Sequence, residues 1–174
     1  MIKWLLLVLL VLVALVAVVA LVGCFLPQDH VVSRSARYAQ PPEAVFDVIH
    51  NVQGGPEWRP GLEAVEMLPP VDGRVRFREV SHGDSITMEI VDAARPTRMV
   101  TRIADPGQPF GGTWTFELVA DGSGTRLTIT ERGEVYNVIF RAVARFVIGH
   151  TATIDGYLKE LGQKFGEPVS IASS

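Results

Sequence analysis

The sequence predicts an α+β domain, an antiparallel sheet with a long C-terminal helix, preceded by one transmembrane helix. The chain begins with an uncharged apolar run from Trp4 to Leu26. Between Leu62 and Val135, short alternating stretches are separated by turn residues, a pattern typical of an antiparallel meander. From Asn137 to Phe165, apolar residues recur at spacings of three and four, which is the period of a helix.

The apolar run has the length of a membrane span. About 23 residues at 1.5 Å each give roughly 34 Å of helix, enough to cross the core of a bilayer. The run is apolar on all faces, and Trp4 stands at one end, where its ring suits the lipid interface. A cleaved secretory signal would have a shorter core and an A-x-A-like site, and the sequence shows neither. We expect residues 1–26 to form a permanent anchor, joined to the domain by a linker of residues 27–30.

Two details of the anchor stay open. Leu21-Val22-Gly23-Cys24 resembles the bacterial lipoprotein box, in which the cysteine is acylated, although the next two residues continue the apolar run. Lys3 favours a cytoplasmic N-terminus, while Arg34 and Arg37 beyond the run weaken that assignment. We expect a single-pass anchor with the domain outside the cytoplasm.

Composition and motifs exclude several function classes. The chain has 16 lysines and arginines, 19 aspartates and glutamates and no basic run, so nucleic acid is not an expected partner. The four histidines and the single cysteine lack the spacing of a metal site. No phosphate-binding glycine motif or nucleophile elbow is present, and we expect no cofactor. The oligomeric state stays open.

The domain, residues 31–166, opens with a strand and two short helical segments. Val31 to Tyr38 is β-prone and ends at a rigid corner of two prolines. Pro42 to Ile49 carries one apolar stripe and begins with Pro-Glu, which suits the first turn of a helix. A glycine-rich stretch follows, and we expect a helical turn around Glu57 and Trp58.

Six strands follow, each bounded by turn residues. Alternation places apolar side chains on one face of each strand, so the sheet has an inner face and a polar outer face. The predicted strands are Leu62–Leu68, Arg74–Val80, Ser85–Ala94, Arg98–Ala104, Thr113–Ala120 and Thr125–Val135.

The last element is expected to be one long helix from Asn137 to about Phe165. Asn137 suits an N-cap, and the apolar stripe includes Val147, His150 and Ile154. That stripe needs an apolar surface to cover, and the inner face of the sheet is the only candidate. Residues 167–174 are small and polar, and we expect a flexible tail.

Two parts of the amino-acid sequence resemble a known protein family. Ser35–Tyr38, Pro41–Ile49 and Glu57-Trp58 look like the opening of the START-like (SRPBCC) superfamily, in particular its polyketide cyclase/dehydrase-like branch with the birch-pollen-allergen, helix-grip fold. Gly111–Phe116 and Gly124–Ile129 look like the final hairpin of that branch. The resemblance covers residues 31–166. It implies a curved antiparallel sheet wrapped around the long C-terminal helix, with a hydrophobic cavity between them.

The same resemblance limits what is implied about function. Members bind lipids, sterols, polyketides, quinones or plant metabolites, and a minority catalyse cyclisation or dehydration. No catalytic motif is shared across the family, so no catalytic residue is carried over, and the fold alone does not set the function.

Glu131 and His150 are the residues best suited to chemistry in such a cavity. Alternation places Glu131 on the inner face, where apolar surroundings disfavour its charge; a bulge or an arginine partner at the rim is the plainer alternative. His150 lies in the helical stripe and is suited to bind a ligand or act as a base, though a lone histidine there is more often a core residue. The sequence does not say whether the two meet.

Aromatic and apolar side chains complete the predicted cavity wall. Trp114 is expected on the inner face, Trp58 as a plug or as part of a lid, and Tyr136 with its hydroxyl at one end of the cavity. The predicted ligand-binding residues are Trp58, Phe77, Met88, Trp114, Phe116, Glu131, Tyr136, Val147, His150 and Ile154.

The sequence favours a membrane-anchored domain that binds a hydrophobic small molecule, such as a lipid, a quinone or a polyketide-like compound, without catalysis. One alternative is a cyclase or dehydratase that uses Glu131, His150 and Tyr136 as acid/base groups. A second is an assembly module of a membrane complex, whose core would be too full to admit a ligand.

Overall fold

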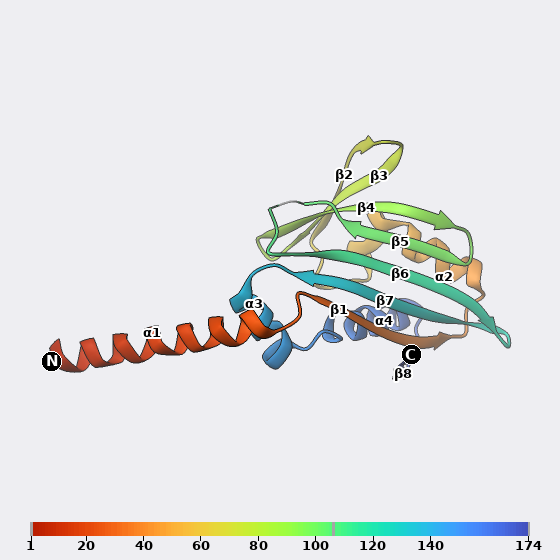
Figure 1. Ribbon diagram of the computed structural model, residues 1–174. Helices are drawn as coiled ribbons and strands as arrows, with labels where there is room; N and C mark the ends of the chain where they lie inside the picture. The colour runs from red at the N-terminus through yellow and green to blue at the C-terminus, as the bar shows by residue number, and fades with distance from the viewer. Residues whose placement is uncertain (1, 106, 174) are drawn as a thin grey trace.

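The computed structural model describes residues 2–105 and 107–173 (Figure 1). Helix α1 (Ile2–Phe25) extends away from the folded domain, and only Gly23 near its end is buried. By length and composition, α1 is apolar enough to cross a membrane.

The domain is built on one antiparallel sheet of eight strands, in the order β2-β3-β4-β5-β6-β7-β1-β8. Short turns join β2 to β7 as a meander, and β1 pairs with β7 along its whole length. The predicted strands are all present: β1 (Asp29–Tyr38), β2 (Ala64–Val71), β3 (Arg74–Ser81), β4 (Asp84–Ala94), β5 (Arg98–Ile103), β6 (Phe110–Asp121) and β7 (Gly124–Val135), followed by the short β8 (Ile171–Ser173).

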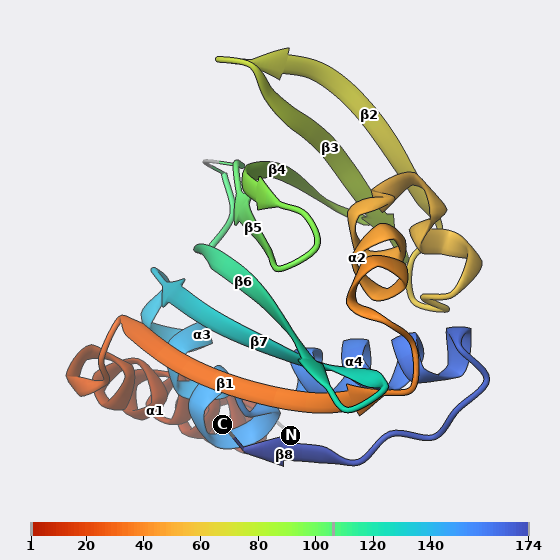
Figure 2. The same cartoon turned by 90° about the vertical axis from the view of Figure 1, so that its right-hand side faces the viewer.

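The sheet curls into an open arc, and helices α2 and α4 lie on its inner side (Figure 2). The helical elements of the domain are α2 (Pro42–His50), the 3-10 helix η1 (Val52–Glu57), α3 (Val138–Val143), the π-helical turn η2 (Ala144–Ile148) and α4 (Ala152–Lys164). This arrangement confirms the helix-grip fold.

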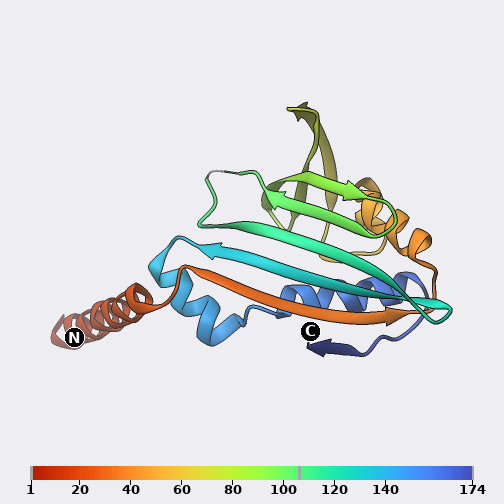
Figure 3. The same ribbon diagram turned by 45° about the vertical axis from the view of Figure 1, so that its right-hand side comes forward.

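The prediction of one continuous C-terminal helix is wrong. The Asn137 side chain caps α3 as expected, because its oxygen accepts hydrogen bonds from the backbone of Ile139 and Phe140. The helix then widens into η2 and stops at Gly149, whose φ of 77° lies outside the helical range. α4 starts again three residues later, so two helical pieces run from α1 towards the far end of the sheet (Figure 3).

The core lies between α4 and the inner face of the sheet. Ile154, Leu158 and Leu161 of α4 are fully buried in one hydrophobic cluster with residues of β1, β6 and β7. The hydroxyl of Tyr38, at the end of β1, donates to the Leu158 carbonyl at 2.9 Å. Burial raises the pKa of this tyrosine well above its ordinary value, so the hydroxyl stays a donor.

The secondary structure near both ends of the domain differs in detail from the prediction. β1 begins at Asp29, inside the expected linker, so only residues 26–28 separate it from α1. Ile171–Ser173 form β8 in place of a flexible tail. Strand β8 pairs with part of the otherwise unpaired edge of β1, and Ile171 packs against the core, which explains why this segment is held.

Candidate functional site: a cavity between the sheet and the C-terminal helices

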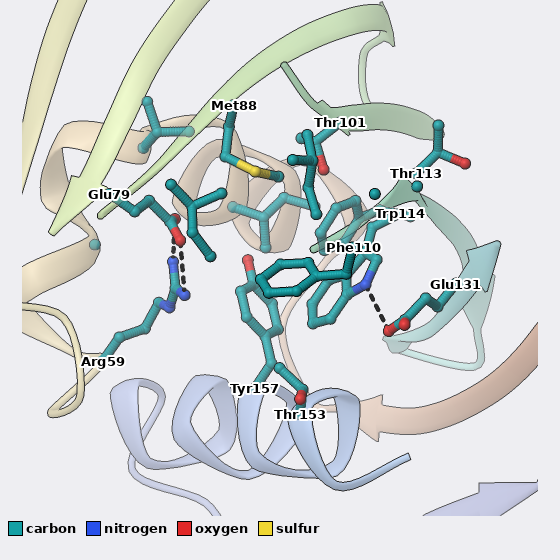
Figure 4. Close-up of a pocket in the computed structure, with 18 of the residues that line it drawn as sticks. Arg59, Glu79, Met88, Thr101, Phe110, Thr113, Trp114, Glu131, Thr153 and Tyr157 are labelled. Carbon is teal, nitrogen blue, oxygen red and sulfur yellow. Dashed lines mark hydrogen bonds and ion pairs between the residues drawn. The ribbon is translucent and has the colours of Figure 1, made fainter. Parts of the chain in front are cut away.

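A cavity of about 330 Å³ lies between the inner face of the sheet and the helices. At one end it is bounded by α2 and η1, and at the other by α3 and the break before α4. Most of its wall is aliphatic or aromatic (Figure 4). Three groups of polar side chains lie in it, centred on Tyr157, Arg59 and Glu131, and further polar residues such as Asn51, Thr101 and Thr153 also line the wall.

Tyr157 rises from α4 into the middle of the cavity (Figure 4). Its ring lies against three other aromatic rings, with centroids 5.2 Å from Trp58, 5.8 Å from Trp114 and 5.6 Å from Phe116. Burial raises the pKa of the phenol, so its proton is retained. No hydrogen bond joins this hydroxyl to any residue that the structure describes, which leaves it available to a ligand.

An ion pair closes the end of the cavity near η1. The Arg59 guanidinium donates to both carboxylate oxygens of Glu79, at 2.5 and 3.2 Å, and lies 5.4 Å from the centre of the Tyr157 ring. Burial lowers the pKa of Arg59, but the hydrogen bond and the charge of Glu79 outweigh it and the net shift is upward. The two charges therefore neutralise each other, which suits an apolar ligand.

Glu131 organises the opposite end. One carboxylate oxygen accepts the indole N–H of Trp114 at 2.8 Å, and the other lies 3.0 Å from Nε2 of His30 (Figure 4 shows the first bond). Gly133 makes room for this arrangement, because a side chain there would collide with the His30 ring. Since both oxygens already have partners, Glu131 holds Trp114 and His30 in position.

His150 joins this cluster through His30. The two imidazole rings stack with centroids 3.9 Å apart. The pKa of His150 is lowered, first by burial and then by the charges of His30 and Arg145, while Glu131 opposes the shift. The structure thus brings Glu131 and His150 to one end of the cavity, with His30 between them.

Most of the predicted ligand-binding residues line this cavity, and whether they contact a ligand stays a prediction. The residues in question are Trp58, Phe77, Met88, Trp114, Phe116, Glu131 and His150.

Three predicted residues lie elsewhere. Tyr136 is 47% exposed, and its hydroxyl donates to Glu134 at 2.8 Å rather than entering the cavity. Val147 is 77% exposed, because η2 turns away from the phase of the expected helix. Ile154 keeps that phase but is packed into the core next to the cavity.

The sequence prediction left out many residues of the cavity wall, among them the polar residues Tyr157, Arg59, Glu79 and His30. Tyr157 belongs to the apolar stripe of α4. A tyrosine in such a stripe carries a hydroxyl towards the apolar side, and this could have marked it as a cavity residue. Arg59 and Glu79 meet only through the fold, and His30 was assigned to the linker. Within residues 2–105 and 107–173, no group of histidine, cysteine and carboxylate side chains suits a metal ion.

Residues 29–163 match the family model described as polyketide cyclase / dehydrase and lipid transport. The chain belongs to this family. Among curated proteins, none matches the sequence. The family assignment agrees with the observed sheet, helix and cavity.

Several solved structures share this fold. The protein TTHA0849 from Thermus thermophilus is 21% identical, with a TM-score of 0.64, over 78% of this chain and 96% of its own. A START superfamily protein from Mycobacterium smegmatis is 20% identical, with a TM-score of 0.62, over the same shares. The Zhui aromatase/cyclase from a Streptomyces species, R1128, is 18% identical, with a TM-score of 0.57, over 79% of this chain and 96% of its own. At these identities the likeness concerns the fold.

Proposed function

We propose that this polyketide cyclase-like protein is a membrane-anchored binder of one apolar small molecule that carries a hydrogen-bonding oxygen. The observation that carries the proposal is the aromatic cavity with the Tyr157 hydroxyl at its centre and no protein acceptor for it among the described residues. Small-molecule sites are mostly apolar, with a few placed polar groups that orient the ligand. A lipid chain, a quinone or a polyketide-like ring system has this combination.

The size of the cavity narrows the ligand class. A volume of about 330 Å³ is at the lower end of the ~300–1,000 Å³ typical of small-molecule pockets. It favours a compact ring system or a single acyl chain over a lipid with two chains. A core too full to admit a ligand would have favoured an assembly module. The presence of this cavity argues against that alternative.

Contacts at the end of α1 support a permanent anchor. The Arg141 guanidinium donates to the Gly23 and Leu26 carbonyls at 3.2 and 3.0 Å. Gly23 also packs so closely on the Val138 backbone that any side chain there would collide with it. The last turn of α1 is thus part of the folded domain, whereas a cleaved signal would make no such contacts. A tether of this kind keeps the cavity at high effective concentration near membrane-borne ligands.

The experiment that tests binding is native mass spectrometry of the full chain, extracted gently from its own membrane. We expect one apolar molecule per chain, identified after its release. A protein that arrives empty and takes up no fatty acid, quinone or aromatic polyketide added to it would contradict the proposal.

Two matched variants locate the ligand. Thr101→Phe adds a ring inside the cavity, and Thr115→Phe adds the same ring on the outer face of the neighbouring strand. We expect the first to abolish ligand occupancy and the second to retain it. Tyr157→Phe keeps the ring packing and removes only the hydroxyl, and we expect about a tenfold loss of affinity. Equal occupancy in the two phenylalanine variants would place the ligand elsewhere.

The anchor is tested by the mass of the intact protein from the membrane fraction. We expect the full chain, with the domain open to protease added outside intact cells. A chain shortened at its N-terminus would indicate a cleaved signal, and an acylated chain beginning at Cys24 would indicate a lipoprotein. A domain protected from the protease would reverse the orientation.

The cluster of His30, Glu131 and His150 favours a second candidate function, acid/base catalysis of dehydration or cyclisation. His150 is a candidate base, since its lowered pKa keeps it neutral near neutral pH. To test this function, the compounds bound to the wild type and to His150→Gln are identified by mass spectrometry and compared. If the variant carries a compound with one more water than the wild type does, the protein is a dehydratase; identical compounds favour a carrier.

A further inference from the structure

The segment Val138–Ile148, which comprises α3 and η2, is attached directly to the end of α1. We call it the juxtamembrane segment. The Val138 backbone packs on Gly23, and Arg141 donates to the carbonyl of Gly23 in the last turn of α1 and to that of Leu26 just after it. The segment therefore lies level with the C-terminal end of α1, where a span of this length leaves the hydrocarbon core (Figures 1 and 3).

The outer side of the juxtamembrane segment is apolar. Phe146 and Val147 are 68% and 77% exposed, and Ile139, about two turns earlier, is 41% exposed. Arg145 is exposed beside them. Adjacent bulky apolar side chains with a cation are the composition of a helix that lies in the lipid interface, apolar side inward and cation among the phosphates.

The inner side of the same segment forms the nearest wall of the cavity. Phe140 and Ala144 line it, followed by Gly149 and His150 in the break before α4. The Phe140 ring meets the ring of Phe110, at the start of β6, with centroids 5.9 Å apart. Both rings line the cavity at the end nearest α3.

The break in the helix separates this wall from the rigid part of the domain. η2 is a π-helical turn, and Gly149 ends it in an extended, positive-φ conformation. α4 is held by its buried face, whereas the exposed residues of η2 have no such partner among the described residues. Phe140 and Ala144, which form this wall, therefore belong to a helical piece separate from α4.

We propose that the juxtamembrane segment lies in the interface of the bilayer and that the cavity opens to the lipid between Phe110 and Phe140. The occupant of the exposed apolar side is the bilayer itself, because this side continues the surface of α1. The inference rests on the proposed function, since it describes how an apolar ligand enters the cavity without crossing water. It adds a lipid-binding surface and a route of entry to the cavity.

The first test measures depth in the membrane. Cys24 is the only cysteine, so a Cys24→Ala background accepts one new cysteine at a time. Val147→Cys and Val119→Cys, each labelled with an environment-sensitive fluorophore, are placed in phosphatidylcholine vesicles that contain a nitroxide-labelled phosphatidylcholine. Val119 is a matched control, 63% exposed near the end of β6 farthest from α1. We expect a blue shift and loss of most of the emission at 147, and neither change at 119. Equal behaviour at the two positions overturns the proposal, and quenching at 147 that depends on protein concentration rather than on the nitroxide lipid assigns the surface to a second copy.

The second test measures the route of entry without knowledge of the ligand. Thr101→Cys places a thiol on the cavity wall, and Val119→Cys again serves as the exposed control. Each variant is treated with an alkyl maleimide dissolved in the vesicles and, separately, with a charged maleimide in water. We expect the cavity thiol to react only with the lipid-borne reagent and the control thiol to react faster with the charged one. A cavity thiol that reacts with the charged reagent, or with neither, overturns the lipid route, while ligand found by mass spectrometry would leave the binding function standing.

Discussion

Helix α4 and the juxtamembrane segment share one apolar period in the sequence but pack in opposite ways. α4 buries Ile154, Leu158 and Leu161 completely, and its backbone accepts a hydrogen bond from Tyr38. The juxtamembrane segment turns Phe146 and Val147 outward and ends at Ile148, before Gly149. The same residue types therefore serve two surfaces, the inner face of the sheet in one case and, as we propose, the lipid in the other. A helical apolar stripe identifies a surface to be covered and leaves open what covers it.

The largest expected effect separates the two regions by stability. Leu158→Ala removes a fully buried side chain from α4 and should lower the free energy of unfolding by ~2–5 kcal/mol. Val147→Ala shortens an exposed side chain and should change it by less than ~0.5 kcal/mol. Urea unfolding of the full chain in detergent, followed by tryptophan fluorescence, measures both. If Leu158→Ala and Val147→Ala lowered the free energy of unfolding equally, the proposed difference in packing between α4 and the juxtamembrane segment would be wrong.

A smaller effect is expected from the ion pair at the closed end of the cavity. Glu79→Gln leaves the half-buried Arg59 without its carboxylate and should cost ~1–3 kcal/mol in the same assay. Glu66→Gln is the control, because the Arg78–Glu66 pair is exposed and should contribute ~0–1 kcal/mol. If the two substitutions cost the same, Arg59 and Glu79 do not stabilise the closed end.

The hydrogen bond from Tyr38 of β1 to the Leu158 carbonyl of α4 is expected to contribute still less to the free energy of unfolding. Tyr38→Phe removes a buried hydroxyl and keeps the ring, and should lower the free energy of unfolding by ~0.5–1.5 kcal/mol. Tyr136→Phe makes the same change at an exposed tyrosine near the juxtamembrane segment, where we expect almost none. A larger loss of unfolding free energy for Tyr136→Phe than for Tyr38→Phe would contradict the view that α4 is packed more firmly than the juxtamembrane segment.

The smallest effect is a pH dependence at His150. Its pKa lies below the ordinary 6.5, chiefly because of burial and then because of His30 and Arg145, with Glu131 opposing. The unfolded chain therefore takes up a proton at higher pH than the folded chain does, so the free energy of unfolding falls as pH drops below ~6.5 and levels off below the folded pKa. His150→Gln should flatten this slope in urea unfolding across a pH series. An unchanged slope would rule out His150 as its source.

The fold was predictable because its signals are local. Alternation gave the strands, and the Asn137 cap gave the start of the last helical region, since both depend on neighbouring residues. The break at η2 was not predictable from the period, because Phe146 and Val147 keep a helical spacing and only their surroundings differ.

The candidate site was predictable only in part. Trp114 and Glu131 follow from alternation in β6 and β7, which face each other in the register of the sheet. The Arg59–Glu79 pair and the His30–His150 stack join residues from separate elements, and no spacing in one sequence encodes such meetings. His30 reaches the cavity because β1 begins two residues earlier than expected.

The short connection between α1 and β1 gives the anchor a mechanical consequence. In the anchored arrangement that we propose, a pull transmitted along the backbone passes through residues 26–28 into β1, which lies between β7 and β8 in the sheet. The hydrogen bonds of an antiparallel ladder run perpendicular to the strands, so a force along β1 loads the whole ladder from Asp29 to Tyr38 in shear rather than one bond at a time. Such tension is therefore resisted by the whole β1–β7 ladder together and not by its first bond alone.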